Sequence, residues 1–177
     1  MKKKLIIGLV IIALFIIYFT RVYYVNATGG KIEKFEYAIG QTAEYNNYLY
    51  TVKSTRVLNV DELNQEFKLK IENGASYDIK YIVSEIEMEY TGDIASPVCP
   101  LLYATYQSGA WHNGESEAFL QINNNSMKME KGKKYTLYTA GALTEIGFSK
   151  DDWKKVNDMK FELVLSTYPK EIILKCN

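Results

Sequence analysis

Residues 82–90 read IVSEIEMEY and largely alternate apolar side chains with polar or charged ones. Ile86 and Met88 are separated and flanked by three glutamates: Glu85, Glu87 and Glu89. Successive side chains of a β-strand point to opposite faces of its sheet. The stretch therefore predicts a strand with one buried face and one face that carries a row of carboxylates.

Alternation of the same period recurs along most of the chain. It is most regular at Glu66–Asn73 (EFKLKIEN), where Phe67, Leu69 and Ile71 would share one face. Polar, turn-forming clusters separate the alternating runs. Further strands are predicted at Tyr48–Val52, Glu117–Ile122, Lys134–Thr139, Lys160–Leu165 and Ile172–Cys176. This pattern predicts an all-β fold, an antiparallel β-sandwich, with a barrel as the alternative.

One segment has helical features instead. Ser149–Asn157 (SKDDWKKVN) begins with a residue type that caps helices, and Asp152 follows three positions later, as in a capping box. Trp153 and Val156 are three residues apart and would lie on one side of a helix. We expect a short helix that crosses over between two strands.

The N-terminal residues predict a helix that inserts into a membrane. Three lysines precede Leu5–Thr20, a run without charged, Asn or Gln residues. This run is slightly short of the roughly 20 residues that span a bilayer core. Arg21 can snorkel, and Tyr23 and Tyr24 suit the membrane interface. We expect residues 1–25 to form an uncleaved signal anchor, with the N-terminus in the cytoplasm and the C-terminal domain outside the cell.

Two alternatives remain for this helix. Val25, Asn26 and Ala27 are compact residues of the kind that precede a signal-peptidase site, so cleavage after Ala27 would release a secreted protein. A helix buried in the core would need every face covered by the rest of the chain. Residues 26–31 (NATGGK) are predicted to be a tether, and residues 32–177 the β-sandwich domain.

The charge of the predicted domain argues against some partners. After Gly30 the chain has 17 basic and 21 acidic residues, and its Lys and Arg residues form no block. A mildly acidic domain is not typical of proteins that bind nucleic acid. We expect no nucleic-acid partner and no cofactor. The expected partners are the membrane, through the N-terminal helix, and an extracytoplasmic protein, peptide or envelope ligand.

Residues 37–59 resemble part of a known family of domains. They contain an aromatic residue before Ile39 and Gly40, a short strand, a polar turn, and then a long strand that opens at Tyr50. This layout is similar to the telokin-like, immunoglobulin-like sandwich domains of unknown function in membrane-anchored or secreted surface proteins of Gram-positive bacteria. The resemblance implies an immunoglobulin-like β-sandwich outside the cell, and it implies no catalytic residues.

Four residues in one segment are candidates for ligand contact. Tyr103 and Tyr106 precede Trp111 and His112, which lie in a loop bounded by glycines. Exposed Tyr and Trp side chains supply a large contact area at low entropic cost. The alternative is that Trp111 packs onto the edge of the sandwich. A single histidine does not make a metal site by itself, and no metal site is expected.

Cys99 and Cys176 are the two cysteines of the chain. Export permits a disulfide between them, which would stabilise the domain by roughly 4–5 kcal/mol in the chain-entropy model. Two unpaired, buried thiols are the alternative. Without a Cys-x-x-Cys motif, a redox or catalytic thiol is not expected.

Together these features predict a noncatalytic binding module that is held outside the cell. An alternative function is a carboxylate-dependent hydrolase that would use Glu85, Glu87 and Glu89. That alternative requires at least two of the carboxylates to line a cleft. A second alternative is a structural component of an envelope assembly.

Overall fold

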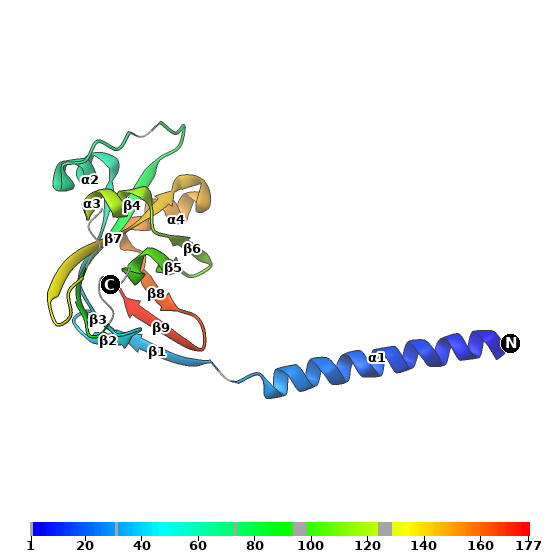
Figure 1. Ribbon diagram of the computed structural model, residues 1–177. Coiled ribbons are helices and arrows are strands. Elements are labelled where there is room, and N and C mark those ends of the chain that lie inside the picture. The colour runs from blue at the N-terminus through cyan, green and yellow to red at the C-terminus, as the bar shows by residue number, and fades with distance from the viewer. Residues whose placement is uncertain (1, 31, 73, 94–98, 124–128) are drawn as a thin grey trace. The chain divides into compact units, whose positions relative to one another are not determined.

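The computed structural model describes residues 2–30, 32–72, 74–93, 99–123 and 129–177. The chain divides into two compact units, 1–32 and 33–177. Helix α1 (Lys2–Thr28) belongs to the first unit, and the β-strands labelled in Figure 1 belong to the second.

Helix α1 contains the predicted membrane-inserted segment. It continues to Thr28, so the first residues of the predicted tether are helical as well. The segment Val10–Ala27 is long and apolar enough to cross a membrane, and its large side chains, such as Phe15 and Phe19, are exposed. A signal sequence and a membrane anchor both have this length and composition.

One sheet of the second unit has the order β2-β3-β4-β7, with antiparallel neighbours. It consists of β2 (Thr42–Tyr45), β3 (Tyr48–Asn59), β4 (Ile79–Tyr90) and β7 (Lys134–Thr144). The strands predicted at 48–52, 82–90 and 134–139 are thus confirmed as parts of longer strands. Asn46 and Asn47 both have positive φ, at 51° and 63°, which suits the tight hairpin between β2 and β3.

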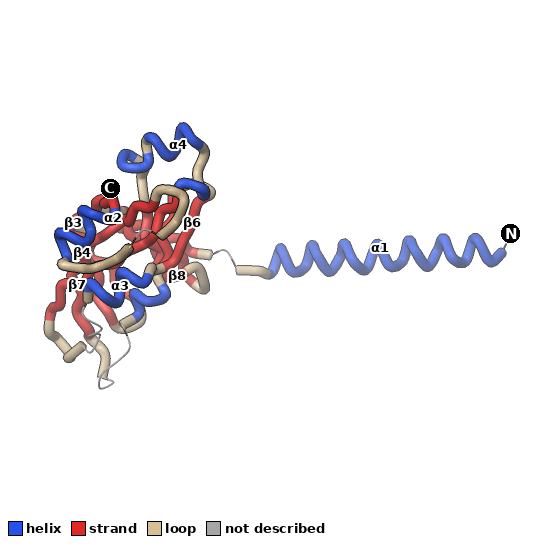
Figure 2. Tube along the Cα trace, turned by 90° about the horizontal axis from the view of Figure 1, so that it is seen from above, coloured by secondary structure: helices blue, strands red, loops and turns tan. Residues whose placement is uncertain are grey.

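The other sheet has the order β1-β9-β8-β5-β6. It consists of β1 (Glu33–Tyr37), β5 (Thr105–Ser108), β6 (Trp111–Gly114), β8 (Glu162–Ser166) and β9 (Lys170–Lys175). Strand β1 is parallel to β9, whereas the other pairs are antiparallel. The two sheets share one hydrophobic core, with short helices at the periphery (Figure 2). The predicted β-sandwich is confirmed, but an immunoglobulin-like strand order is not.

The strand predicted at 66–73 is wrong. Helix α2 (Val60–Phe67) occupies the first part of this stretch. Its C-terminal cap is Lys68, which has a left-handed backbone with φ 56°. Asn59 and Glu62 form a capping box at the start of the helix: the Glu62 amide donates to Asn59 Oδ1 at 2.9 Å, and the Asn59 amide donates to Glu62 Oε2 at 2.8 Å. The capped helix thus includes only Glu66 and Phe67 of this stretch, and residues 69–72 are neither helix nor strand. There the Asn64 side chain bonds both backbone groups of Ile71, donating to its carbonyl at 2.8 Å and accepting from its amide at 2.9 Å.

The strand predicted at 117–122 is also wrong. These residues form helix α3 (Glu117–Ile122), and its Ala118 and Phe119 are buried against β7. The predicted crossover helix is present as α4 (Lys150–Lys154), followed by the 3-10 turn η3 (Val156–Asp158). As expected, the Asp152 amide donates to Ser149 Oγ, at 3.1 Å.

A polar cluster joins the two sheets in the middle of the core. Tyr106 of β5 is fully buried, and its hydroxyl donates to Ser84 Oγ of β4 at 2.8 Å and also bonds Thr139 of β7. The hydroxyl groups of Thr55 and Ser84 are 2.7 Å apart. Buried polar groups are stable when they are paired, so this cluster fixes how the sheets face each other.

Candidate functional site

A groove of about 520 Å³ lies on the outer face of the sheet that contains β5 and β8. Its floor is formed by side chains of three neighbouring strands, and exposed tyrosines border one end. The floor residues are Thr105, Gln107, His112, Val164, Leu165 and Ser166, and the bordering residues are Tyr103, Thr167 and Tyr168. The volume falls within the range of ordinary small-molecule sites.

Strand register explains how this groove forms from distant parts of the chain. Gln107 of β5 pairs with His112 of β6, and Thr105 pairs with Val164 of β8. Paired residues lie on the same face of a sheet, and the neighbouring Tyr106 points into the core. The outward side chains of three strands therefore form one continuous floor.

The tyrosines come from the segments that flank these strands. Tyr103 ends the 3-10 turn η1 (Pro100–Tyr103) just before β5, and Tyr168 lies in the connection after β8. The start of β5 pairs with the end of β8, so both segments are at the same end of the sheet. The exposed fractions are 79% for Tyr103 and 77% for Tyr168. Both rings are thus accessible to a ligand.

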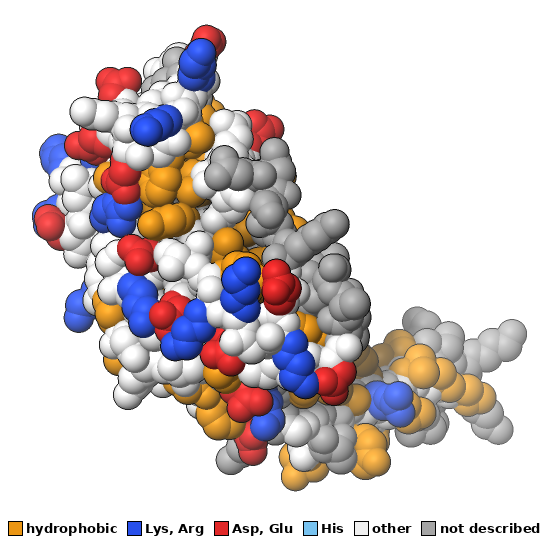
Figure 3. Space-filling view, turned by 60° about the vertical axis from the view of Figure 1, so that its left-hand side comes forward, with side chains coloured by type: hydrophobic (Ala, Val, Ile, Leu, Met, Phe, Trp, Pro, Cys, Tyr) orange, Lys and Arg blue, Asp and Glu red, His pale blue; other side chains and the backbone are white. Residues whose placement is uncertain are grey.

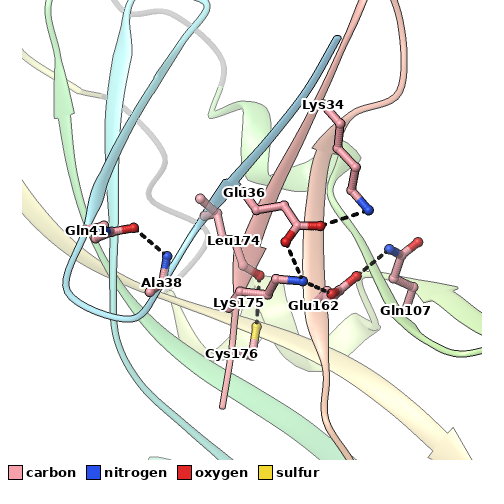
Figure 4. A network of polar contacts seen from close by, with 9 residues as sticks. All are labelled: Lys34, Glu36, Ala38, Gln41, Gln107, Glu162, Leu174, Lys175 and Cys176. Carbon is pink, nitrogen blue, oxygen red and sulfur yellow. Dashed lines mark hydrogen bonds and ion pairs between the residues drawn. The ribbon is translucent and has the colours of Figure 1, made fainter. Parts of the chain in front are cut away.

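An ion-pair network, drawn in Figure 4, is connected to the floor residue Gln107. Gln107 Nε2 donates to Glu162 Oε2 at 2.7 Å, while Lys175 pairs with the other oxygen of Glu162. Lys175 Nζ also lies 3.1 Å from Glu36 Oε2. The other oxygen of Glu36, Oε1, lies 2.9 Å from Lys34 Nζ. This row of polar side chains crosses the sheet from β5 to β1, and Gln107 connects it to the groove.

The charges of this network compensate one another. Partial burial alone would raise the pKa of Glu162, but hydrogen bonds from Lys175 and Gln107 hold it below its usual value. The hydrogen bond to Glu162 raises the pKa of Lys175, although desolvation opposes it. Both side chains therefore remain ionised at neutral pH, and the pair adds no net charge beside the groove.

The structure brings together two of the four residues predicted to contact a ligand. Tyr103 and His112 both line the groove. Tyr106 does not, because it is fully buried, and this corrects its prediction as a surface residue. Trp111 is half-buried and stacks on Phe148 with ring centroids 5.6 Å apart, which matches the packing alternative. The predicted loop around His112 is in fact the β5–β6 hairpin.

Sequence reasoning missed the residues that complete the groove. Gln107, Val164, Ser166 and Tyr168 carry no motif, and the last three lie more than 50 positions after His112 in the chain. Tyr168 did have a detectable signal, since an aromatic residue before a proline separates two predicted strands. Only the pairing of β5 with β8 shows that it belongs near Tyr103.

Glu115, directly after β6, is a half-buried residue whose carboxylate Oε1 is buried. Its Oε2 accepts a hydrogen bond from the Ala140 amide at 2.7 Å, whereas its Oε1 is buried without a partner. Burial raises its pKa to about 8, although the Ala140 hydrogen bond acts in the opposite direction. The side chain is therefore largely protonated at neutral pH.

Cys99 and Cys176 are separate, buried thiols in the structure, so the disulfide considered above is not formed and the unpaired alternative is present. Burial raises the pKa of each thiol to about 11. Cys176 lies in the polar core cluster, where it accepts from Ser84 Oγ at 3.7 Å. Both cysteines have the surroundings of structural rather than reactive thiols.

The glutamate row of β4 lies on the outward face of its sheet, and all three side chains are partly exposed. Glu87 Oε1 lies 3.0 Å from Lys134 Nζ and 3.4 Å from Lys53 Nζ. The hydrogen bond from Lys134 lowers the pKa of Glu87. The depression beside Glu87 and Glu89 has a volume of about 60 Å³. Glu87 is thus neutralised by two lysines on a shallow surface, which is unlike the cleft that a hydrolase needs.

Among the described residues, no group of three or more His, Cys, Asp or Glu side chains is placed to hold a metal ion. The fold and the groove define a two-sheet β-sandwich domain that follows an N-terminal apolar helix. The chain belongs to a family described as a domain of unknown function, DUF5028, whose model matches residues 31–172.

Comparison with solved structures gives an uncharacterized β-sandwich protein from Clostridium difficile 630. The two chains share 11% sequence identity with a TM-score of 0.39, and the match covers 84% of this chain and 97% of the other. No curated protein is significantly similar to this chain.

Proposed function

We propose that this protein is a noncatalytic binding module, held outside the cell by α1, and that it binds an envelope ligand in the groove. The observation that carries this proposal is the groove itself, with a floor of both polar and apolar side chains and the highly exposed rings of Tyr103 and Tyr168. Exposed aromatic rings beside a concave floor with polar groups are typical of ligand sites.

The proposed location explains how a shallow site can be effective. Three lysines precede the apolar helix, and such charges favour the cytoplasmic side, which leaves residues 33–177 outside. A tethered domain meets surface ligands at a high effective concentration, so a modest affinity is enough. An envelope component therefore fits better than a dilute soluble ligand.

The surface charge of the domain supports a partner other than nucleic acid. Acidic and basic side chains are interspersed over the face shown in Figure 3. Charged side chains of the domain also form ion pairs, such as Lys53 with Glu87 and Arg56 with Glu66. A nucleic-acid site would instead need a continuous basic surface.

Removing both groove tyrosines is expected to weaken binding to the envelope. We expect the double variant Tyr103→Ser/Tyr168→Ser of the full-length protein to bind purified envelope about tenfold more weakly or worse, because each ring supplies contact area. Co-sedimentation of the detergent-solubilised protein with envelope fragments measures the bound fraction. Ile146→Ser is the matched control, since Ile146 is 73% exposed and lies outside the groove. Equal binding by both variants would contradict the groove proposal.

An uncleaved anchor implies that the mature protein keeps its N-terminal residues. We expect the native protein to sediment with membranes and to keep residues 1–27, because the apolar helix α1 remains in the bilayer. N-terminal sequencing of the exported protein checks this. A mature chain that starts at Thr28 would show that the helix is a cleaved signal and that the module is released.

A further inference from the structure

We propose that the groove binds an uncharged, hydroxyl-rich saccharide of the cell envelope. This inference rests on the proposed function, because it names the ligand class of the same groove. Three features of the site support it: the absence of charge in the lining, the position of the floor within the sheet, and the mixture of aromatic and hydroxyl groups.

The first feature is the chemistry of the lining. Among the described residues that line the groove, none is Lys, Arg, Asp or Glu. Glu162, which accepts a hydrogen bond from the floor residue Gln107, is already paired with Lys175. Phosphate and carboxylate ligands are usually bound by Arg or Lys, so an anionic ligand is disfavoured. The lining suits a neutral ligand.

The second feature separates a saccharide from an extended peptide. Peptides often bind by adding a strand to an exposed sheet edge. Of the floor residues, only His112 is on β6, the edge strand of this sheet. The rest of the floor lies over β5 and β8, and both of these strands are already paired on two sides: β5 with β6 and β8, and β8 with β5 and β9. Their backbone groups are used within the sheet, so the floor offers side-chain contacts rather than a free edge.

The third feature is the combination of aromatic rings with polar side chains that can form hydrogen bonds. Thr105 contributes a hydroxyl group, and the Ser166 hydroxyl, which donates its proton to the Tyr168 carbonyl oxygen at 3.1 Å, keeps its capacity to accept. Gln107 keeps its carbonyl Oε1 as an acceptor after Nε2 donates to Glu162. Sugars present hydroxyl groups around the ring edge and C–H groups on the ring face. The polar side chains of the floor match the first and the exposed rings of Tyr103 and Tyr168 match the second.

The test uses envelope material whose sugars or proteins have been destroyed selectively. Full-length protein in detergent is co-sedimented with delipidated wall fragments and, separately, with vesicles of extracted envelope lipids. Each material is used untreated, after periodate oxidation of sugar diols, and after protease digestion. We expect periodate to reduce the tyrosine-dependent binding at least tenfold and protease to leave it unchanged. The material that binds shows whether the sugar belongs to the wall or to a glycolipid.

A matched pair of variants tests the hydrogen-bonding part of the proposal. Thr105→Val removes a hydroxyl group from the floor while keeping the shape and β-propensity of the side chain. We expect about tenfold weaker binding, because the ligand hydroxyl loses its partner. Thr136→Val, on the exposed face of β7, is the control and should bind normally.

The outcomes separate the two proposals. Binding that needs Tyr103 and Tyr168 but is lost with protease and kept after periodate would overturn the saccharide proposal and leave the groove proposal standing, with a protein partner. Binding that is indifferent to both tyrosines would overturn the proposed function itself. Full binding by Thr105→Val would contradict a ligand that is recognised through its hydroxyl groups.

Discussion

Replacing Glu115 with glutamine is expected to remove most of the dependence of stability on pH between about pH 4.5 and 8. The Glu115 side chain accepts a hydrogen bond from the Ala140 amide through Oε2, and its Oε1 is buried without a partner. An ionised carboxylate in this place lacks compensation for its lost hydration. Glutamine keeps the acceptor for Ala140 and cannot ionise.

The sign of the effect follows from the direction of the pKa shift. Burial raises the pKa of Glu115 from 4.5 to about 8 in the folded protein, so the fold favours the protonated form. The stabilisation is fully present below pH 4.5 and is lost as the pH rises towards 8. A shift of this size corresponds to on the order of 5 kcal/mol. The glutamine variant should therefore exceed the wild type most clearly at pH 8.

Urea unfolding of the full-length protein at several pH values measures this difference. Glu44→Gln is the control, because Glu44 is an exposed carboxylate on β2. We expect the control to follow the wild-type pH profile. An unchanged pH profile in Glu115→Gln would show that the buried carboxyl group is not the source of the dependence.

Replacing Tyr106 with alanine is expected to destabilise the domain by about 3–5 kcal/mol. The side chain is fully buried between the sheets, so truncation leaves a cavity. It also removes the hydrogen bonds to Ser84 and Thr139. Such a loss is a large part of the 5–15 kcal/mol that stabilises an ordinary domain. Any loss of binding in this variant would therefore report unfolding.

Tyr106→Phe divides this effect into packing and hydrogen bonding. Phenylalanine keeps the ring and loses the hydroxyl, so we expect a smaller loss of about 1–3 kcal/mol. Denaturant unfolding followed by near-ultraviolet circular dichroism measures both variants. If Tyr106→Ala unfolded at the wild-type urea concentration, Tyr106 would not have its central place in the core.

The sequence predicted the long strands because their burial has a clear period. In β4, residues such as Ile86 and Met88 are fully buried, while Glu85 and Glu87 stay on the outer face. The same reasoning failed at 66–73 and 117–122, where alternation is also present. In the first stretch, the helix that begins at the Asn59 capping box ends at Phe67, and the Asn64 side chain then bonds the backbone of Ile71. In the second, the packing of Phe119 on β7 favours a helix. Local periodicity alone does not contain these contacts.

The candidate site was predicted only in part for a similar reason. Tyr103 and His112 are close in sequence, and their segment was recognisable by its aromatic residues. Tyr106 is of the same type, but its position in β5 turns it into the core. Tyr168 joins the groove only through the register of β5 with β8. Register between distant strands depends on the whole fold, so no local pattern specifies it.

Photo-crosslinking from position 168 in intact cells shows directly whether an envelope ligand binds in the groove. The full-length protein would carry a benzophenone amino acid in place of Tyr168, or in place of the exposed residue Thr136 on the other sheet. Benzophenone inserts into C–H bonds of either sugars or proteins, so the test does not depend on the ligand class. A ligand in the groove would give a covalent adduct of envelope material at position 168 and none at position 136. Equal labelling at both positions, or none at position 168, would contradict a ligand in the groove.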